Sequence, residues 1–234
     1  MLLNNLSIVV PAKKESQNLE FIIPDLKKYS SDIIVVDGHS NDGTEEICKK
    51  YNVRFILDNN LGKGDAQRVG AKEVRYENLI FFDSDGSHDH NDIGKIFYYL
   101  QDKKYDLVVT SRKTGGTYDI TSNLNFSGFI RETGCGFLSL IFNKCFKTEY
   151  SEVLYSLKGV KTKKFLDLDT SENKFGIELE ILALGIINKL KIIEIPSREK
   201  KRVYGKSKLS TITGIYFIYQ IIKYFIFQKK FKKF

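Results

Sequence analysis

The sequence predicts an α/β fold of doubly wound type, in which helices flank a mostly parallel sheet. Two patterns support this prediction. The candidate strands are short β-branched runs typical of buried parallel strands, at residues 6–10, 33–36, 53–57, 79–82 and 107–110. The candidate helices are amphipathic segments that follow loops rich in Asn, Asp, Ser or Gly, at residues 18–28, 44–51, 65–74 and 92–100. Alternation of the two predicts right-handed βαβ units with a ligand crevice at the carboxyl ends of the strands.

Composition narrows the class of protein. With 234 residues the chain is long enough for one large domain with a full core, and only 3 prolines argue against collagen-like or disordered classes. Three widely spaced cysteines without an apolar leader predict a reducing, cytosolic compartment rather than a disulfide scaffold. The last 37 residues hold 11 Lys and Arg against one acid, so the net charge of +8 comes from the tail. The near-neutral body argues against a nucleic-acid partner.

The loops after four consecutive strands carry carboxylates, glycines or a lysine, at residues 11–18, 37–44, 60–66 and 83–89. Asp83 and Asp85 follow an apolar run and are separated by one residue, so two hard oxygen ligands can share a divalent cation bound to a diphosphate. Such pairs also occur as helix caps. We expect this turn to be exposed.

Asp37 follows the second strand, where its carboxylate can accept hydrogen bonds from a ribose or a base edge. The alternative is that Asp37 braces the turn while Asp42 caps the next helix, and for Asp42 we favour capping. Residues 62–64 form a Gly-Lys-Gly loop that suits close approach of a ligand to the backbone. Neither a Walker A pattern nor G-x-G-x-x-G occurs, which argues against a nucleotide hydrolase or a hydride-transfer enzyme.

Together these loops resemble glycosyltransferase family 2, whose members have the GT-A fold, and within it the dolichol-phosphate mannosyltransferase-like branch. The segments that match its motifs occur in the family's order, at residues 9–18, 36–44, 62–66, 83–89, 110–116 and 202–208. The resemblance implies transfer of a hexose, with inversion, from a nucleotide diphosphate sugar of the GDP-mannose or UDP-glucose type. The implied acceptor is a polyprenyl phosphate such as dolichyl or undecaprenyl phosphate.

The resemblance also implies roles for individual residues. Those implied to line the donor pocket are Pro11, Glu15, Asp37, Lys63, Asp65 and Ser84. Those implied to hold Mg²⁺ or Mn²⁺ are Asp83 and Asp85. Those implied to act in catalysis, the basic ones by supplying positive charge to the donor and acceptor phosphates, are Asp85, Arg112, Arg131, Arg202 and Lys208.

The sequence departs from the family pattern at three places. Gly38 replaces the second Asp of the usual D-D pair, which removes one candidate contact to the nucleotide. The family's D-x-x-S-G-F-R segment is altered at residues 155–161, with Tyr155 at the acidic position and Lys161 at the arginine. Cys135 stands where the branch often has a serine, and we expect a buried or half-buried, unreactive thiol.

The C-terminal segment predicts a membrane-surface helix. Residues 211–227 are strongly apolar but too short for a full span, and Gln220 with Lys223 marks a polar seam. Residues 229–234, Lys-Lys-Phe-Lys-Lys-Phe, suit anionic headgroups. We therefore expect a GT-A domain at 1–210 and an interfacial helix with a basic tail at 211–234, peripheral on the cytosolic membrane face. The alternative is that the helix packs on its own domain or on a second protomer.

Two rival functions stay open at this point. The acceptor can instead be a sugar or small-molecule hydroxyl, which requires a general base, and the available carboxylates are Asp89, Glu132 and Glu152. An inactive GT-A scaffold that serves as a binding protein is the second rival, and intact Asp83 and Asp85 argue against it. A sugar nucleotidyltransferase is disfavoured because residues 9–12 lack a glycine-rich signature.

Overall fold

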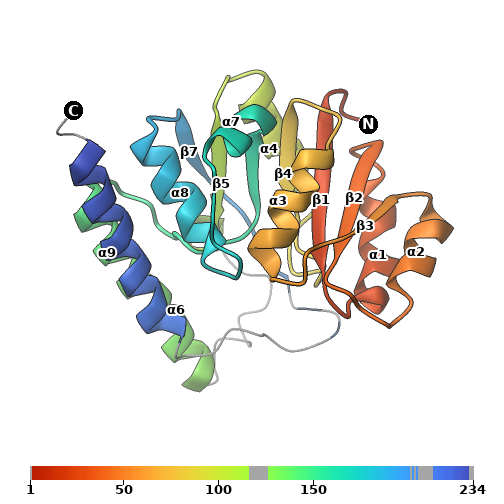
Figure 1. Cartoon of the computed structure of the whole chain (residues 1–234), viewed down its shortest axis with the longest axis horizontal. Helices are drawn as coiled ribbons and strands as arrows, with labels where there is room; N and C mark the ends of the chain where they lie inside the picture. The colour runs from red at the N-terminus through yellow and green to blue at the C-terminus, as the bar shows by residue number, and fades with distance from the viewer. Residues whose placement is uncertain (1, 116–125, 201, 203, 205–212, 232–234) are drawn as a thin grey trace.

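A seven-stranded sheet forms the centre of the molecule in this computed structural model (Figure 1). The structure describes residues 2–115, 126–200, 202, 204 and 213–231, without the side chains of 126–133, 213 and 229–231. The strand order is β3-β2-β1-β4-β6-β5-β7. The strands are β1 (Leu6–Ala12), β2 (Asp32–Asp37), β3 (Arg54–Leu57), β4 (Asn78–Phe81), β5 (Leu107–Ser111), β6 (Lys158–Lys161) and β7 (Ile192–Pro196).

Strands β1 to β4 are parallel, as the alternating pattern predicts, and β1 lies between β2 and β4. The expectation of a buried strand at residues 53–57 is wrong for β3, which lies at the edge of the sheet with Leu57 exposed. Arg54 of this strand instead pairs with the buried carboxylate of Asp32, at 2.5 Å. An edge strand has only one neighbour, so its apolar run is only partly covered.

An antiparallel strand that the sequence analysis did not predict separates β4 from β5. Strand β6 pairs antiparallel with both of them, with Gly159 opposite Ile80 and Val108. A Cβ at Gly159 would overlap the side chain of Ile96, because helix α4 (Asp92–Gln101) packs directly on this strand. Strand β5 is therefore parallel only to β7.

Helices cover both faces of the sheet, as expected. Alternate residues along each strand point to opposite faces. The face that contains Ile8, Val35 and Ile80 packs on α1 (Ser16–Leu26), α2 (Thr44–Tyr51) and α4. The face that contains Val9, Val36 and Phe81 packs on a larger group of helices. These are α3 (Lys63–Glu73), α6 (Phe126–Phe146), α7 (Thr162–Asp167), α8 (Ile177–Ile187) and α9 (Thr213–Phe231), while α5 (Arg112–Gly115) directly follows β5.

Helix α9 lies beside α6 and α8 at one side of the molecule (Figure 1). Phe217, Ile221 and Tyr224 join the hydrophobic core. The predicted polar seam is wrong for Gln220, which is buried against the protein, whereas Lys223 is exposed. One side of α9 therefore packs on the chain's own domain, which is one of the alternatives that the sequence leaves open. Among the described residues, no helix is both long and apolar enough to cross a membrane.

Candidate active site

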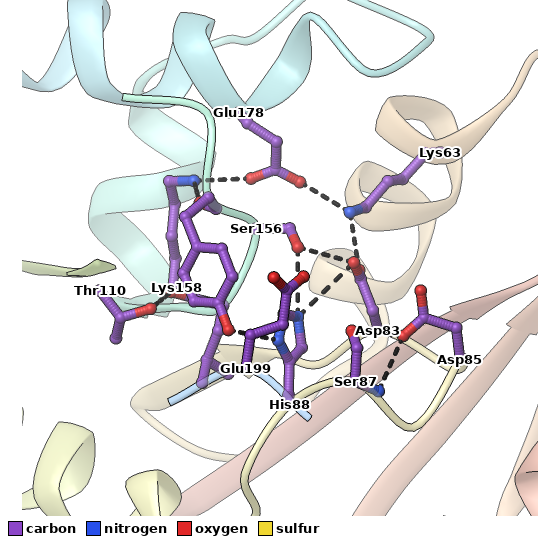
Figure 2. A network of polar contacts seen from close by, with 12 residues as sticks. Lys63, Asp83, Asp85, Ser87, His88, Thr110, Ser156, Lys158, Glu178 and Glu199 are labelled. Carbon is purple, nitrogen blue, oxygen red and sulfur yellow. Dashed lines mark hydrogen bonds and ion pairs between the residues drawn. The ribbon is translucent and has the colours of Figure 1, made fainter. Parts of the chain in front are cut away.

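Charged side chains meet in a buried network at the carboxyl end of β4 (Figure 2). Lys63 Nζ, from the first turn of α3, lies 2.6 Å from Asp83 Oδ1 and 2.9 Å from Glu178 Oε1. Glu178 Oε2 in turn accepts a hydrogen bond of 2.8 Å from Lys158 Nζ. Burial lowers the pKa of Lys158, whereas the two carboxylates outweigh burial and raise the pKa of Lys63. Lys63 is therefore a fixed cation beside Asp83.

Two further side chains contact Asp83, and a third contacts one of these two. Ser156 Oγ donates a hydrogen bond of 2.6 Å to Asp83 Oδ2, and His88 Nε2 lies 3.5 Å from the same oxygen. His88 Nδ1 is 3.2 Å from the hydroxyl of Tyr155, the residue at the family's acidic position. Burial alone would raise the pKa of Asp83, but the neighbouring Lys63 and His88 hold it well below its usual value. Asp83 is thus a carboxylate at neutral pH.

The turn that carries Asp85 is buried, contrary to the expectation of an exposed loop. Ser84 is 6% exposed and Asp85 is 8% exposed. Asp85 Oδ1 accepts hydrogen bonds from the backbone and hydroxyl of Ser87, at 3.0 and 2.6 Å, and Arg202 Nη2 lies 2.8 Å from Oδ2. The covering segment follows β7 and is joined to the turn by the bond from Lys200 N to Ser87 O, 2.7 Å long.

Arg112 begins α5 and is held between two carboxylates. Its Nε donates to Glu152 Oε1 at 2.8 Å, and its Nη1 donates to Glu199 Oε2 at 2.6 Å. Its guanidinium carbon lies 5.8 Å from the ring centre of Tyr155. Burial raises the pKa of Glu152 against the opposing effect of Arg112. Cys135 is half-buried, which confirms the expected burial of this thiol.

The ends of β1 and β2 form the second part of the site. Asp37 is fully buried, and its Oδ2 accepts a hydrogen bond of 2.6 Å from Ser40 N. Its Oδ1 has no partner in the part of the chain that the structure describes. A buried acceptor without a donor is costly, so this atom is suited to a ligand. Asp42 accepts hydrogen bonds from the backbone and hydroxyl of Thr44, the first residue of α2, but the N-cap position is Gly43 and not Asp42.

The other predicted donor residues lie around these strand ends. Pro11 pairs in register with Val36 near the end of β1. Glu15 Oε2 accepts a hydrogen bond from Asn18, 2.6 Å long. Asp65 accepts hydrogen bonds from the backbone and side chain of Asn59, so its carboxylate holds the loop before α3. The side chain of Arg131 and the whole of Lys208 lie outside the described residues, as do the side chain of Glu132 and the tail at 232–234.

Sequence reasoning missed Lys158, Glu178, Glu199 and Ser156. They come from segments 70 to 120 residues along the chain from the Asp83 turn. Ser156 and Lys158 lie in the altered family segment at residues 155–161, and Glu178 lies in an apolar run, Ile177–Ile187. A charge in such a run is seldom buried without a partner. The sequence does not indicate which opposite charge provides that partner.

Comparison with known protein families identifies the family to which this chain belongs. The chain matches the family model described as Glycosyl transferase family 2 over residues 7–144, which is more than half of its length. The chain belongs to glycosyl transferase family 2. The resemblance inferred from the strand-end motifs is thereby confirmed, and so is the transferase class of this family 2 chain.

Relatives and solved structures agree with this membership of family 2. An uncharacterized protein of Methanocaldococcus jannaschii is 29% identical over 94% of this chain and 92% of its own length. A protein of Methanococcus voltae named UDP-N-acetylglucosamine–dolichyl-phosphate N-acetylglucosaminyltransferase is 23% identical over 89% of each chain. Glucosyl-3-phosphoglycerate synthase from Mycobacterium tuberculosis, solved with Mn²⁺, UDP-glucose and phosphoglyceric acid, has a TM-score of 0.73. At 16% identity over 94% of this chain and 79% of that one, the last likeness shows the GT-A fold.

The residues of this family 2 site fit part of a divalent-metal shell. Among the described residues, no three His, Cys, Asp or Glu side chains converge as a complete metal site. Asp83 and Asp85 carry hard oxygen atoms two positions apart in the sequence, and each is balanced by a cation, Lys63 or Arg202. Mg²⁺ is usually bound by one or two carboxylates together with substrate phosphates and water. The donor set therefore suits a metal that arrives with a diphosphate.

Proposed function

We propose that the chain is a Mg²⁺- or Mn²⁺-dependent inverting transferase that moves a hexose from a nucleotide diphosphate sugar to a polyprenyl phosphate. The observation that carries this proposal is the set of opposite charges at the carboxyl ends of β4 and β5. Asp83 and Asp85 lie beside the basic groups Lys63 and Arg202, with Arg112 at the end of β5. Such a set can bind a diphosphate and stabilise it as it leaves.

The proposed chemistry needs no strong base. An oxygen of the acceptor phosphate attacks the anomeric carbon on the face opposite the diphosphate, and the bond from that carbon to the diphosphate oxygen breaks. Asp83 and Asp85 would hold the metal, which neutralises charge on the leaving diphosphate. Lys63 and Arg202 would add positive charge, while Asp37 Oδ1 would accept a hydrogen bond from the nucleoside.

The rival with a hydroxyl acceptor has less support. Glu152 is buried and paired with Arg112, so it lies in an ion pair rather than in contact with an acceptor. Asp89 is buried too and lies 3.2 Å from Lys200 Nζ. An acceptor that is already an anion removes the need for either group to take a proton.

We also propose that α6 and α9 contact a membrane surface. Their exposed apolar side chains include Phe137, Leu140, Ile215, Tyr219, Ile222, Ile226 and Phe227. Exposed apolar patches of this kind mark interaction surfaces, and an acceptor with a polyprenyl chain is itself membrane-bound. Replacing Ile215, Ile222 and Ile226 with Ser should weaken binding to anionic liposomes. The matched control is Leu166→Ser on α7, and equal binding by all three proteins would contradict the membrane contact.

The donor is tested by calorimetric titration of UDP, GDP and their hexose conjugates, with and without Mn²⁺. Metal-dependent binding of one nucleotide would support the transferase site and name the donor class. Lipid-phosphate acceptors can then be compared with free sugars in a turnover assay. Failure of the folded protein to bind any of these nucleotides would contradict the proposal and favour the inactive scaffold.

A further inference from the structure

Helix α9 turns a row of polar side chains toward the protein. Tyr216, Gln220 and Tyr224 are spaced four residues apart and therefore lie on one side of the helix. The hydroxyl of Tyr216 and Nε2 of Gln220 both donate to Glu172 Oε2. The hydroxyl of Tyr224 donates to Glu180 Oε1 at 2.6 Å. Two carboxylates of the domain thus each accept at least one hydrogen bond from α9.

The two carboxylates hold the segment that precedes α8. Glu180 is 1% exposed, and its oxygens accept hydrogen bonds from Ser171 N at 3.0 Å and Glu172 N at 2.8 Å. Glu172 is therefore fixed through its backbone by Glu180 and through its side chain by α9. The network is buried at Glu180, Gln220 and Tyr224 and reaches the surface at Tyr216, which is 40% exposed. Hydrogen bonds in its buried part are stronger than they would be in water.

The same segment contacts the loop that carries Lys63. The carbonyl of Asn173 accepts a hydrogen bond of 2.9 Å from Gly64 N, and Arg68 Nη1 donates to Glu172 O at 2.6 Å. A Cβ at Gly62 would lie 2.8 Å from Asn173 O, and one at Gly64 would overlap Glu172 O. The backbone on both sides of Lys63 is thus in close contact with the backbone of residues 172–173. The position of residues 172–173 therefore sets the position of this lysine.

Helix α8 provides a second connection between α9 and Lys63. Glu178 and Glu180 lie two residues apart in its first turn. Glu178 accepts from Lys63 Nζ, as Figure 2 shows, while Glu180 accepts from Tyr224. A shift of this turn would move both contacts together.

We infer that α9 is part of the donor site: its polar contacts with Glu172 and Glu180 position Lys63 for the donor diphosphate. Tyr216, Tyr224 and Glu172 are positioning residues in this view, because they act through Lys63. The inference rests on the proposed function, in which Lys63 contacts the donor. Since coupling between two sites is reciprocal, nucleotide binding must also strengthen the docking of α9.

The test compares nucleotide affinity in matched variants of the full chain. The double variant Tyr216→Phe, Tyr224→Phe removes the two hydroxyl donors, and Glu172→Gln removes the negative charge that the donors of α9 face, each with little change of volume. Tyr219→Phe is the control, because its side chain is 61% exposed on the outer side of the same helix. With UDP and GDP in the presence of Mn²⁺, we expect about tenfold weaker binding in the first two proteins and no change in the control.

A second readout separates positioning from plain stabilisation. Amide hydrogen exchange at residues 214–228 should slow when nucleotide and Mn²⁺ bind to the wild type, and this gain should shrink in Glu172→Gln. Lower melting temperatures with unchanged affinity and no exchange response would overturn the inference alone. If the wild type binds neither nucleotide, the proposed function fails, and this inference fails with it.

Discussion

Arg202 Nη2 lies 2.8 Å from Oδ2 of Asp85 and thereby joins the segment after β7 to the turn after β4. The guanidinium is opposite the carboxylate that we propose as a metal ligand. A divalent cation that binds there must compete with Arg202, and a displaced Arg202 would be available for the donor phosphates. We therefore expect metal binding at Asp85 to replace this ion pair.

Replacing Arg202 with Gln should change metal binding and turnover in opposite directions. Loss of the competing cation should tighten Mn²⁺ binding to the nucleotide-free protein severalfold, while loss of charge at the diphosphate should lower turnover about tenfold or more. Calorimetry with Mn²⁺ alone and a donor turnover assay measure the two effects. Arg198→Gln, at an exposed position in the same segment, is the control. Weaker Mn²⁺ binding in Arg202→Gln would contradict the competition.

Asp85→Asn should lower turnover at least about a hundredfold, because it removes a charged ligand while keeping the volume of the side chain. The burial of Asp85 makes Asn a better replacement than Ala, since an amide oxygen can still accept the hydrogen bonds of Ser87. Circular dichroism checks the fold, and turnover is measured with Mn²⁺ and with excess EDTA. Full activity of the variant in EDTA would refute the metal assignment.

Lys63→Met should destabilise the protein by about 3 kcal/mol, because it leaves the carboxylates of Asp83 and Glu178 without the cation between them. The matched control is Lys49→Met, which breaks an exposed pair with Glu45 on α2 and should leave the free energy of unfolding nearly unchanged. Urea unfolding monitored by circular dichroism gives both values. An equal decrease in the free energy of unfolding in the two variants would show that the buried pairs of Lys63 stabilise the fold no more than an exposed pair does.

Two glycine substitutions should have opposite effects on stability. Gly64→Ala places a methyl group against the backbone of Glu172, so we expect a loss of about 2 kcal/mol or more and weaker donor binding. Gly94, in α4, has nothing within 4 Å of a Cβ, so Gly94→Ala should stabilise by roughly 0.5–1 kcal/mol. Thermal unfolding measures both. A neutral Gly64→Ala would mean that the 172–173 segment does not restrain this loop.

The docking of α9 should weaken at high pH. Burial and the hydrogen bond to Glu172 raise the pKa of Tyr216 to about 12, and burial with the bond to Glu180 raises the pKa of Tyr224. The contribution of a group with a raised pKa is complete below its unfolded value near 10 and is lost as the pH rises toward the folded value. Wild type should therefore lose stability relative to the Tyr216→Phe, Tyr224→Phe variant between pH 10 and about 12. Urea unfolding of both proteins across this range measures the difference, and a constant difference would contradict the assignment.

The parallel half of the fold and its chemical loops could be predicted because their signals are local. Asp37, Lys63 and Asp83 each follow a β-branched or apolar run, and the carboxyl ends of parallel strands meet at one edge of a sheet. Strand β6 could not be found in the same way. It has four residues, begins and ends with lysine, and owes its place to pairing with strands far away in the sequence.

The partners of the site residues were hidden for a related reason. The ion pairs of Arg112 with Glu152 and Glu199 join residues 40 and 87 positions apart in the chain, so no local pattern indicates them. The role of Arg112 at the substrate phosphates stays a prediction. The sequence predicts a polar seam that includes Gln220, whereas Gln220 donates to Glu172 in the fold. Helical spacing does not show which side of a helix meets an acidic neighbour. Local patterns predict where charges lie, and the tertiary fold decides which of them meet.

The place of β6 in the sheet has a consequence for the order in which the chain folds. Strands β1 to β4 pair among themselves and are complete once residue 81 has been synthesised. Within the described part of the chain, strand β5 pairs with β6 and β7 alone, so its first sheet partner there becomes available when residues 158–161 have left the ribosome. Domains generally begin to fold from the N-terminal side during synthesis, and long-range pairing is slow. The nascent protein must therefore carry an apolar, unpaired strand through the synthesis of about 50 further residues, which is the interval when it most needs protection from aggregation.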